Sequence, residues 1–275
     1  MKKGIIVLLT LIYWLFSYAS EEILKKLEKA WSLYEKGQYV EMKNLSKEVL
    51  SESLKENYPK GIIEGYYYLG IANYSLGNLP EALKYAKKAI EFSEKHNKYR
   101  WKAYSHVLVG EIFRSLRKYD KALFHFKKAY QLAKENNNKK MIPPALMNIG
   151  NIHYDKGEFS KATKYYKEAL KIAKDINLRK SYIAFITYNL GITSYRNKEY
   201  KKAKDYLKEA VSLYKNLGNK SSMYESLFYL GKTYMKEGKK EKAKEIFSKI
   251  VKEKPEGFIY KRAKFFLKKL TENKS

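Results

Sequence analysis

Four stretches of the sequence share one pattern: LGIANYSLGNLPEALKYAKKAI at 69–90, VGEIFRSLRKYDKALFHFKKAY at 109–130, IGNIHYDKGEFSKATKYYKEAL at 149–170 and LGITSYRNKEYKKAKDYLKEAV at 190–211. A fifth copy, LGKTYMKEGKKEKAKEIFSKIV at 230–251, and a weaker first copy, KAWSLYEKGQYVEMKNLSKEVL at 29–50, extend the series. Aligned on their second residue, the copies place small residues at intervals of 40, 40, 40, 41 and 40, namely Ala30, Gly70, Gly110, Gly150, Gly191 and Gly231. This near-constant interval indicates a repeat architecture.

Each copy predicts two helices joined by a tight turn. The small residue lies within the first helix and lets the second helix approach closely. Seven residues later a glycine is expected to end that helix in a left-handed cap. The second helix then carries alanines spaced by seven on one face, with a large residue between them. Such a hairpin has one apolar face and buries it only by stacking on its neighbours. The cap position holds Gly37, Gly77, Arg117, Gly157, Lys198 and Gly238, and the large residues are Phe126, Tyr166, Leu207 and Phe247.

This order of small residue, glycine, alanine, aromatic residue and alanine resembles the tetratricopeptide repeat. The resemblance covers about residues 21–254, and it implies an all-α fold: an α-solenoid, a right-handed superhelix of about six helical hairpins with a C-terminal capping helix. The usual unit has about 34 residues, whereas this unit has 40, which suggests longer second helices. The unit length is similar to that of a longer-repeat subgroup whose members bind peptides.

The sequence divides into three predicted regions. Residues 1–20 resemble a secretory signal peptide: Met1-Lys2-Lys3 is followed by an uncharged apolar run and by small residues at Ser17 and Ala19. The apolar stretch 4–19 is slightly shorter than the ~20 residues of a membrane-spanning helix, so cleavage is preferred and retention as an anchor is the alternative. Residues 21–257 form the solenoid, and 258–275 form the capping helix and tail.

Composition disfavours several classes of function. The sequence has no Cys and four scattered His, so it shows no spacing of metal ligands, and we expect neither a metal nor another cofactor. It contains neither an ordered Ser-His-Asp set nor a Gly-rich phosphate loop, so we expect no enzyme activity. The net charge is +28, but the lysines are spread as pairs along the helices, which favours solvated faces over a nucleic-acid site.

The resemblance also implies where a ligand would bind. In this family the first helix of each hairpin lines the concave surface. Asn148 and Asn189, two residues before the small residue, match the asparagine that long-repeat members use to hold an extended peptide. An amide donates and accepts hydrogen bonds, so it can bind a peptide backbone of any sequence. The candidate peptide-binding residues are Asn148, Asn151, Asn189, Tyr67, Tyr74, Tyr154, Tyr188 and Tyr195.

Each of these residues has a structural alternative. An asparagine can bond only within its own or the adjacent hairpin, and a tyrosine can serve as packing between repeats. The paired Lys and Arg with which some family members bind a partner's free C-terminus are not reproduced, because those positions carry Tyr, Val, Met and Phe. The sequence therefore gives no support to C-terminus recognition.

The sequence predicts a non-catalytic scaffold that binds an extended peptide or partner protein and is exported, with a periplasmic location favoured. Anchoring to the inner membrane by residues 4–19 is the alternative location. Two other functions stay open: a basic surface that binds anionic partners such as nucleic acid or lipid, and a sensory or regulatory module that acts in trans. Membrane contact is expected only through the N-terminal segment.

Overall fold

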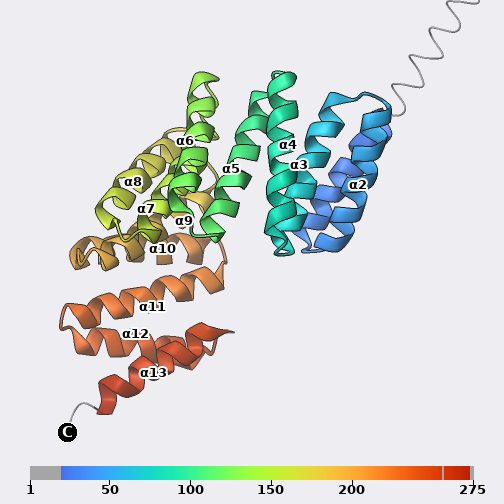
Figure 1. Cartoon of the computed structure of the whole chain (residues 1–275). Coiled ribbons are helices and arrows are strands. Elements are labelled where there is room, and N and C mark those ends of the chain that lie inside the picture. The colour runs from blue at the N-terminus through green and yellow to red at the C-terminus, as the bar shows by residue number, and fades with distance from the viewer. Residues whose placement is uncertain (1–19, 256, 273–275) are drawn as a thin grey trace, which may run out of the picture. The chain divides into compact units, whose positions relative to one another are not determined.

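The computed structural model describes residues 20–255 and 257–272, and these are helical almost throughout (Figure 1). The predicted leader lies outside the described residues except for Ser20. Among the described residues, no helix combines the length and the apolar character needed to span a membrane. A first helix at 20–35 is followed by α2 Tyr39–Lys55, α3 Pro59–Ser75, α4 Leu79–Lys95, α5 Tyr99–Ser115, α6 Tyr119–Glu135, α7 Ile142–Asp155, α8 Phe159–Asp175, α9 Lys180–Arg196, α10 Tyr200–Asn216, α11 Lys220–Lys236, α12 Lys240–Glu253 and α13 Phe258–Glu272.

The helices form two compact units, with the N-terminal unit ending at Asn137 and the C-terminal unit beginning at Asn138. Within each unit consecutive helices pack as antiparallel pairs, and the first helices of neighbouring hairpins also touch: α3 contacts α5, and α9 contacts α11. We call the side on which they lie the first-helix face. The predicted α-solenoid of stacked hairpins is confirmed. The helix α13 begins at Phe258 and packs on α12 and α11.

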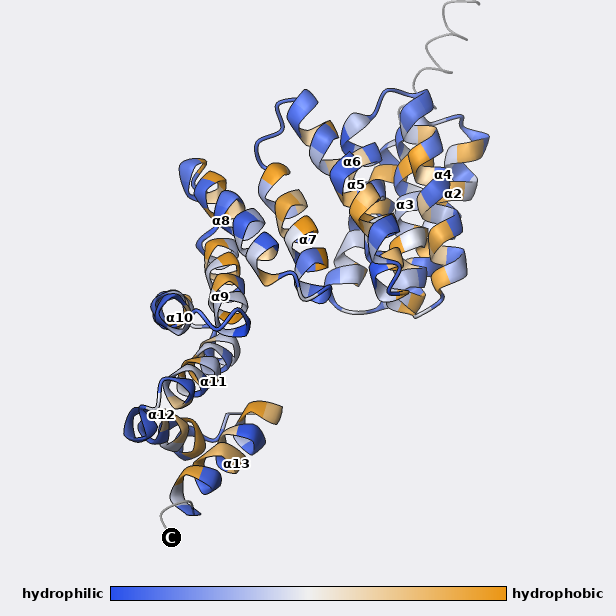
Figure 2. Ribbon diagram, turned by 60° about the vertical axis from the view of Figure 1, so that its left-hand side comes forward, coloured by the Kyte–Doolittle hydropathy of each residue, from blue (hydrophilic) through white to orange (hydrophobic). Residues whose placement is uncertain are grey.

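First and second helices share the extra length of the 40-residue unit. Both helices of the hairpins α3/α4, α5/α6 and α9/α10 have 17 residues. The expectation that the second helices carry the added length is therefore wrong in part. In Figure 2 the first helix α7 is more hydrophobic than its partner α8, because a first helix packs against neighbouring hairpins while a second helix keeps one side in solvent.

In four of the repeats the small residue of the first helix faces the large residue of its partner helix. A Cβ atom added at Gly110 would lie 2.5 Å from Phe126, and one added at Gly150 would lie 2.4 Å from Tyr166. The same relation joins Gly191 to Leu207 and Gly231 to Phe247, at 2.7 Å in each case. The absence of a side chain therefore makes room for a ring or a branched side chain from the second helix.

The cap position adopts the left-handed conformation in every copy. Gly37, Gly77, Gly157 and Gly238 have φ between 73° and 78°, and Arg117 and Lys198 have φ of 55° and 62°. The backbone N–H of Lys118 donates to the carbonyl of Phe113 at 2.8 Å, as in a Schellman motif. Non-glycine residues are strained in this conformation, so the turn geometry is imposed at these two positions by the packing of the hairpin.

A second left-handed series ends the second helices. Asn57, Asn97, Asn137 and Asn177 have φ between 48° and 53°, and Gly218 occupies the equivalent position with φ of 68°. These residues recur at intervals of 40, 40, 40 and 41. Asparagine tolerates this conformation better than other residues that carry a Cβ, so these asparagines are turn residues. This role was not predicted from the sequence, although the regular spacing of the asparagines indicates it.

Replacing Arg117 or Lys198 with glycine is expected to raise the free energy of unfolding by about 0.5–1 kcal/mol, because glycine adopts positive φ without the steric cost of a Cβ. Urea denaturation followed by circular dichroism measures the change. The control is Lys118→Gly, because Lys118 has an ordinary φ of −86° and glycine there only adds entropy to the unfolded chain. Equal shifts for Arg117→Gly and Lys118→Gly would contradict the strain argument.

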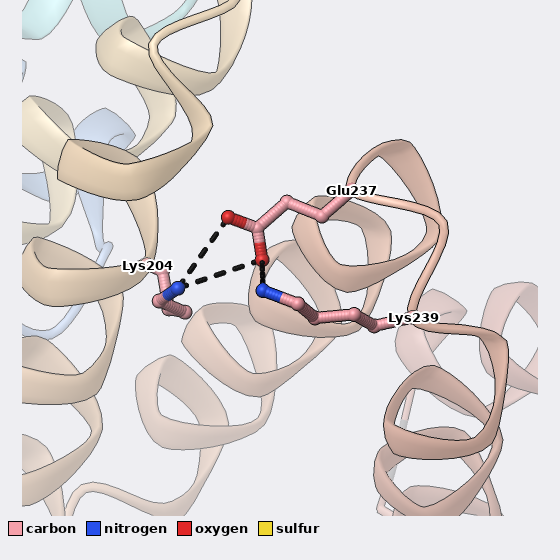
Figure 3. Close-up of polar contacts among 3 residues, drawn as sticks. All are labelled: Lys204, Glu237 and Lys239. Atoms are coloured by element: carbon pink, nitrogen blue, oxygen red, sulfur yellow. Dashed lines mark hydrogen bonds and ion pairs between the residues drawn. The ribbon is translucent and has the colours of Figure 1, made fainter.

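One carboxylate links two hairpins of the C-terminal unit. Glu237, which ends α11, contacts Lys204 of α10 at 3.4 and 3.5 Å and Lys239 at 2.9 Å (Figure 3). The Glu237 side chain is only 15% exposed. Its hydrogen bond with Lys239, together with the one from Lys204, lowers the pKa of Glu237. Lys204 is thus a half-buried lysine whose charge is balanced by a carboxylate.

Candidate functional site

The three candidate asparagines differ in the hydrogen bonds that their side chains make within the protein. Asn148 is half-buried on α7, and no hydrogen-bond partner of its side chain is found among the described residues. Asn189 on α9 donates from Nδ2 to the carbonyl of Phe185 at 2.8 Å, which leaves its Oδ1 as an acceptor. Asn151 accepts a hydrogen bond from the buried Tyr166 hydroxyl at 2.7 Å. Asn148 is therefore the amide with the greatest capacity to bind a peptide backbone, whereas Asn151 has a clear packing role.

The candidate tyrosines of the N-terminal unit lie in and near an aromatic cluster on the first-helix face. Tyr67 packs edge-on against Trp101 with ring centroids 5.3 Å apart, and it lies 6.3 Å from Tyr104. Burial raises the pKa of the Tyr67 hydroxyl. Tyr74 is hydrogen-bonded to Ser115 at 3.0 Å. The cluster consists of Trp31, Tyr34, Tyr67, Tyr68, Trp101 and Tyr104.

This aromatic cluster contains surface that remains open to a ligand. Trp31 is 43% exposed although its ring lies 6.3 Å from that of Tyr68. Exposed tryptophan and tyrosine rings are common contacts in binding sites. Trp31 and Trp101 were not among the candidate residues, because tryptophan occurs at no repeated register that would have marked it.

The candidate tyrosines of the C-terminal unit are brought together by a residue that was not among the candidates. Tyr188 and Tyr195 of α9 both contact Tyr229 of α11 edge-on, with centroids 6.3 and 6.1 Å apart. The Tyr188 hydroxyl also donates to Glu225 at 3.3 Å. Tyr229 occupies the same register as Asn148 and Asn189, two residues before the small residue, so this register marks it.

Tyr154 of α7 extends the same face toward α9. Its ring packs edge-on on Phe159 at 5.5 Å, and its hydroxyl is hydrogen-bonded to Arg196, which raises the pKa of that guanidinium. The first-helix face of the C-terminal unit thus contains Asn148, Tyr154, Tyr188, Asn189 and Tyr195. Their contact with a peptide stays a prediction.

Two histidines that are distant in the sequence meet in the N-terminal unit. His106 of α5 and His125 of α6 have their Nδ1 atoms 3.0 Å apart. Burial lowers the pKa of both rings, and that of His106 falls to about 4. Within residues 20–255 and 257–272 no group of three or more potential ligands is placed to hold a metal ion. The spacing of 19 residues concealed this pair in the sequence.

The comparisons with known proteins point to one repeat family. A family model described as tetratricopeptide repeat matches residues 61–135 and 142–216, and another with the same description matches residues 225–257. A search of curated proteins found no significant match.

Several solved structures are similar. A signal-transduction ATPase with a tetratricopeptide-repeat sensor from Pyrococcus horikoshii has 21% identity and a TM-score of 0.80, and the match covers 95% of this chain and 40% of that one. The apo form of RapI has 17% identity and a TM-score of 0.71, covering 85% and 84%. A Rap protein in complex with the Competence and Sporulation Factor has 19% identity and a TM-score of 0.56, covering 85% and 76%. These similarities show a shared fold.

Proposed function

Because the chain belongs to the tetratricopeptide-repeat family, we propose that it is a non-catalytic scaffold that binds an extended segment of a partner protein on its first-helix face. The observation that carries this proposal is the half-buried Asn148 amide, for which the described residues offer no hydrogen-bond partner. The donor and the acceptor of this amide are both available, and a peptide backbone supplies a partner for each.

The neighbouring side chains suit an extended chain. The acceptor of Asn189 is available, and the rings of Tyr188, Tyr195 and Tyr229 lie together on the same face. Aromatic rings supply contact area at a low entropic cost. The complex of the similar Rap protein with the Competence and Sporulation Factor supports binding of a protein or peptide ligand by this fold.

We also propose that the protein is exported, with a periplasmic location favoured. The support is the sequence of residues 1–20, with its basic start, apolar run and small residues before Ser20. Amino-terminal sequencing of the protein from its native cells distinguishes a mature chain that begins near residue 20 from one that retains Met1.

The binding proposal is tested with the full chain as bait against an extract of the native cells. Three forms are compared: the wild type, the double variant Asn148→Ala/Asn189→Ala, and the control Asn216→Ala, which changes an exposed asparagine of the second helix α10. Washing at about 0.3 M salt removes contacts that depend only on the basic charge. The affinity of each form for peptides from the retained protein is then measured by fluorescence anisotropy.

We expect a discrete protein that the wild type and Asn216→Ala retain and the double variant loses. Each amide contributes about 1 kcal/mol, so the double variant should bind the peptide roughly 30-fold more weakly. Equal retention by the double variant would place the site on another surface. Recovery of only nucleic acid or acidic proteins that salt releases would instead favour the basic surface binder.

A further inference from the structure

Lys232 of α11 lies within a group of four aromatic rings on the first-helix face of the C-terminal unit. Its Nζ is 5.1 Å from the ring centroid of Tyr195, 5.5 Å from Tyr229, 5.9 Å from Phe228 and 5.7 Å from Phe266. These rings come from α9, α11 and α13. The ammonium group therefore sits at the meeting point of three helices, partly withdrawn from solvent.

Other cations surround this lysine. The Arg262 guanidinium lies over the Phe228 ring at 4.3 Å. Burial, followed by the charges of Arg262, Arg196 and Lys236, lowers the pKa of Lys232. Among the described residues no carboxylate lies within ion-pair distance of Lys232. Glu225 accepts from the hydroxyl of Tyr188, whose ring packs on Tyr229. The positive charge at this point is thus uncompensated by the chain itself.

Lys204 of the same unit provides a contrast to Lys232. Both lysines are half-buried in the C-terminal unit, yet Lys204 has the carboxylate of Glu237 as its partner (Figure 3). Contacts with ring faces stabilise a cation by about 0.5–2 kcal/mol, but they leave its charge in place. Like charges held close together in a partly desolvated site repel each other, and a bound anion removes that repulsion.

We propose that Lys232 and its neighbouring cations bind the carboxylate of a glutamate or aspartate side chain in the partner segment. The inference rests on the proposed function, because the site lies on the face assigned to peptide binding. A carboxylate on a flexible side chain can reach a half-buried ammonium between rings. The phosphates of nucleic acid or of a bilayer would instead meet the more exposed lysines of the second helices.

The test uses fluorescein-labelled octapeptides and the full chain in anisotropy titrations at about 0.15 M salt. One peptide alternates glutamate with alanine, and a second alternates glutamine with alanine. The variants are Lys232→Met, which keeps the aliphatic length, Lys232→Arg, which keeps the charge, and Lys208→Met. Lys208 is exposed on α10, so its replacement is a control with the same change in net charge.

We expect the wild type to bind the glutamate peptide at least about tenfold more tightly than the glutamine peptide. Lys232→Met should weaken glutamate-peptide binding by about tenfold, whereas Lys208→Met should change it by less than about twofold, because an exposed charge contributes little. Lys232→Arg should retain most of the affinity. The melting temperature of each variant shows whether it is folded.

Three results would overturn the inference. The first is equal loss in Lys232→Met and Lys208→Met, which indicates diffuse attraction by net charge. The second is equal affinity for the two peptides. The third comes from titrating an oligonucleotide in the same way: Lys232→Met weakens oligonucleotide binding as much as it weakens glutamate-peptide binding. If Lys232→Met has no effect but Asn148→Ala/Asn189→Ala abolishes binding, the proposed function stands and only the carboxylate inference fails.

Discussion

Replacing Gly150 with alanine is expected to lower the free energy of unfolding of the C-terminal unit by about 1–3 kcal/mol, the usual cost of overpacking a core. The new Cβ would lie 2.4 Å from Cε1 and 2.7 Å from Cδ1 of Tyr166. That ring is held on two sides, because Tyr166 is 1% exposed and its hydroxyl donates to Asn151. It cannot move aside without losing packing or the hydrogen bond, and this cost exceeds the roughly 1 kcal/mol of helix propensity that alanine gains over glycine.

Gly70→Ala is the matched control for this prediction. A Cβ at Gly70 would lie 2.9 Å from Cδ2 of Leu108, a methyl group at the end of a flexible side chain, and 3.4 Å from the backbone nitrogen of Ala86. The partner helix carries only alanine at Ala86, so the steric cost of the new methyl group is small. The gain in helix propensity should offset this cost and leave the free energy of unfolding nearly unchanged. Urea denaturation followed by circular dichroism measures both variants. Similar midpoints for Gly70→Ala and Gly150→Ala would show that the facing residue does not set the cost.

Glu64→Gln is expected to stabilise the protein at about pH 8 by up to about 3 kcal/mol and to have little effect near pH 4.5. Glu64 of α3 is only 5% exposed. Burial raises its pKa to about 7, although Lys60, at 4.0 Å, and Arg100 oppose the shift. Because the folded state holds the proton more tightly than the unfolded state, this stabilisation is full below pH ~4.5 and is lost as pH rises through ~7. Glutamine has nearly the same shape and avoids the ionisation.

Thermal denaturation of the wild type and Glu64→Gln at several pH values measures this effect as a difference. Taking the difference also removes the contribution of His106 and His125, whose lowered pKa values make acid destabilising in the same unit. The exposed Glu48 of α2 provides the control, and at pH 8 Glu48→Gln should change stability far less than Glu64→Gln, because surface substitutions usually have small effects. A Glu64→Gln effect that is independent of pH would mean that Glu64 titrates at its ordinary value.

The repeat spacing was sufficient to predict the hairpins, their glycine caps and the close approach of the two helices at the small residue. These features depend on residues seven or sixteen positions apart within one hairpin, and helix geometry relates such residues directly. Arg117 and Lys198 occupy the register of these glycines, and the structure shows that they adopt the same left-handed conformation. The resemblance to the repeat family, rather than the spacing, indicated the first-helix register that holds Asn148, Asn189 and Tyr229.

Only the tertiary structure decided which partners each side chain at those registers contacts. Asn148 and Asn151 have the same chemistry in the sequence, but Tyr166 of the partner helix occupies the oxygen of Asn151 alone. Lys232 follows Gly231 as Asn151 follows Gly150, yet rings from three helices surround it. The division into two compact units was likewise not apparent in a uniform repeat. Periodicity determines which face a residue occupies, whereas its partners and its exposure depend on side chains that neighbouring helices place around it.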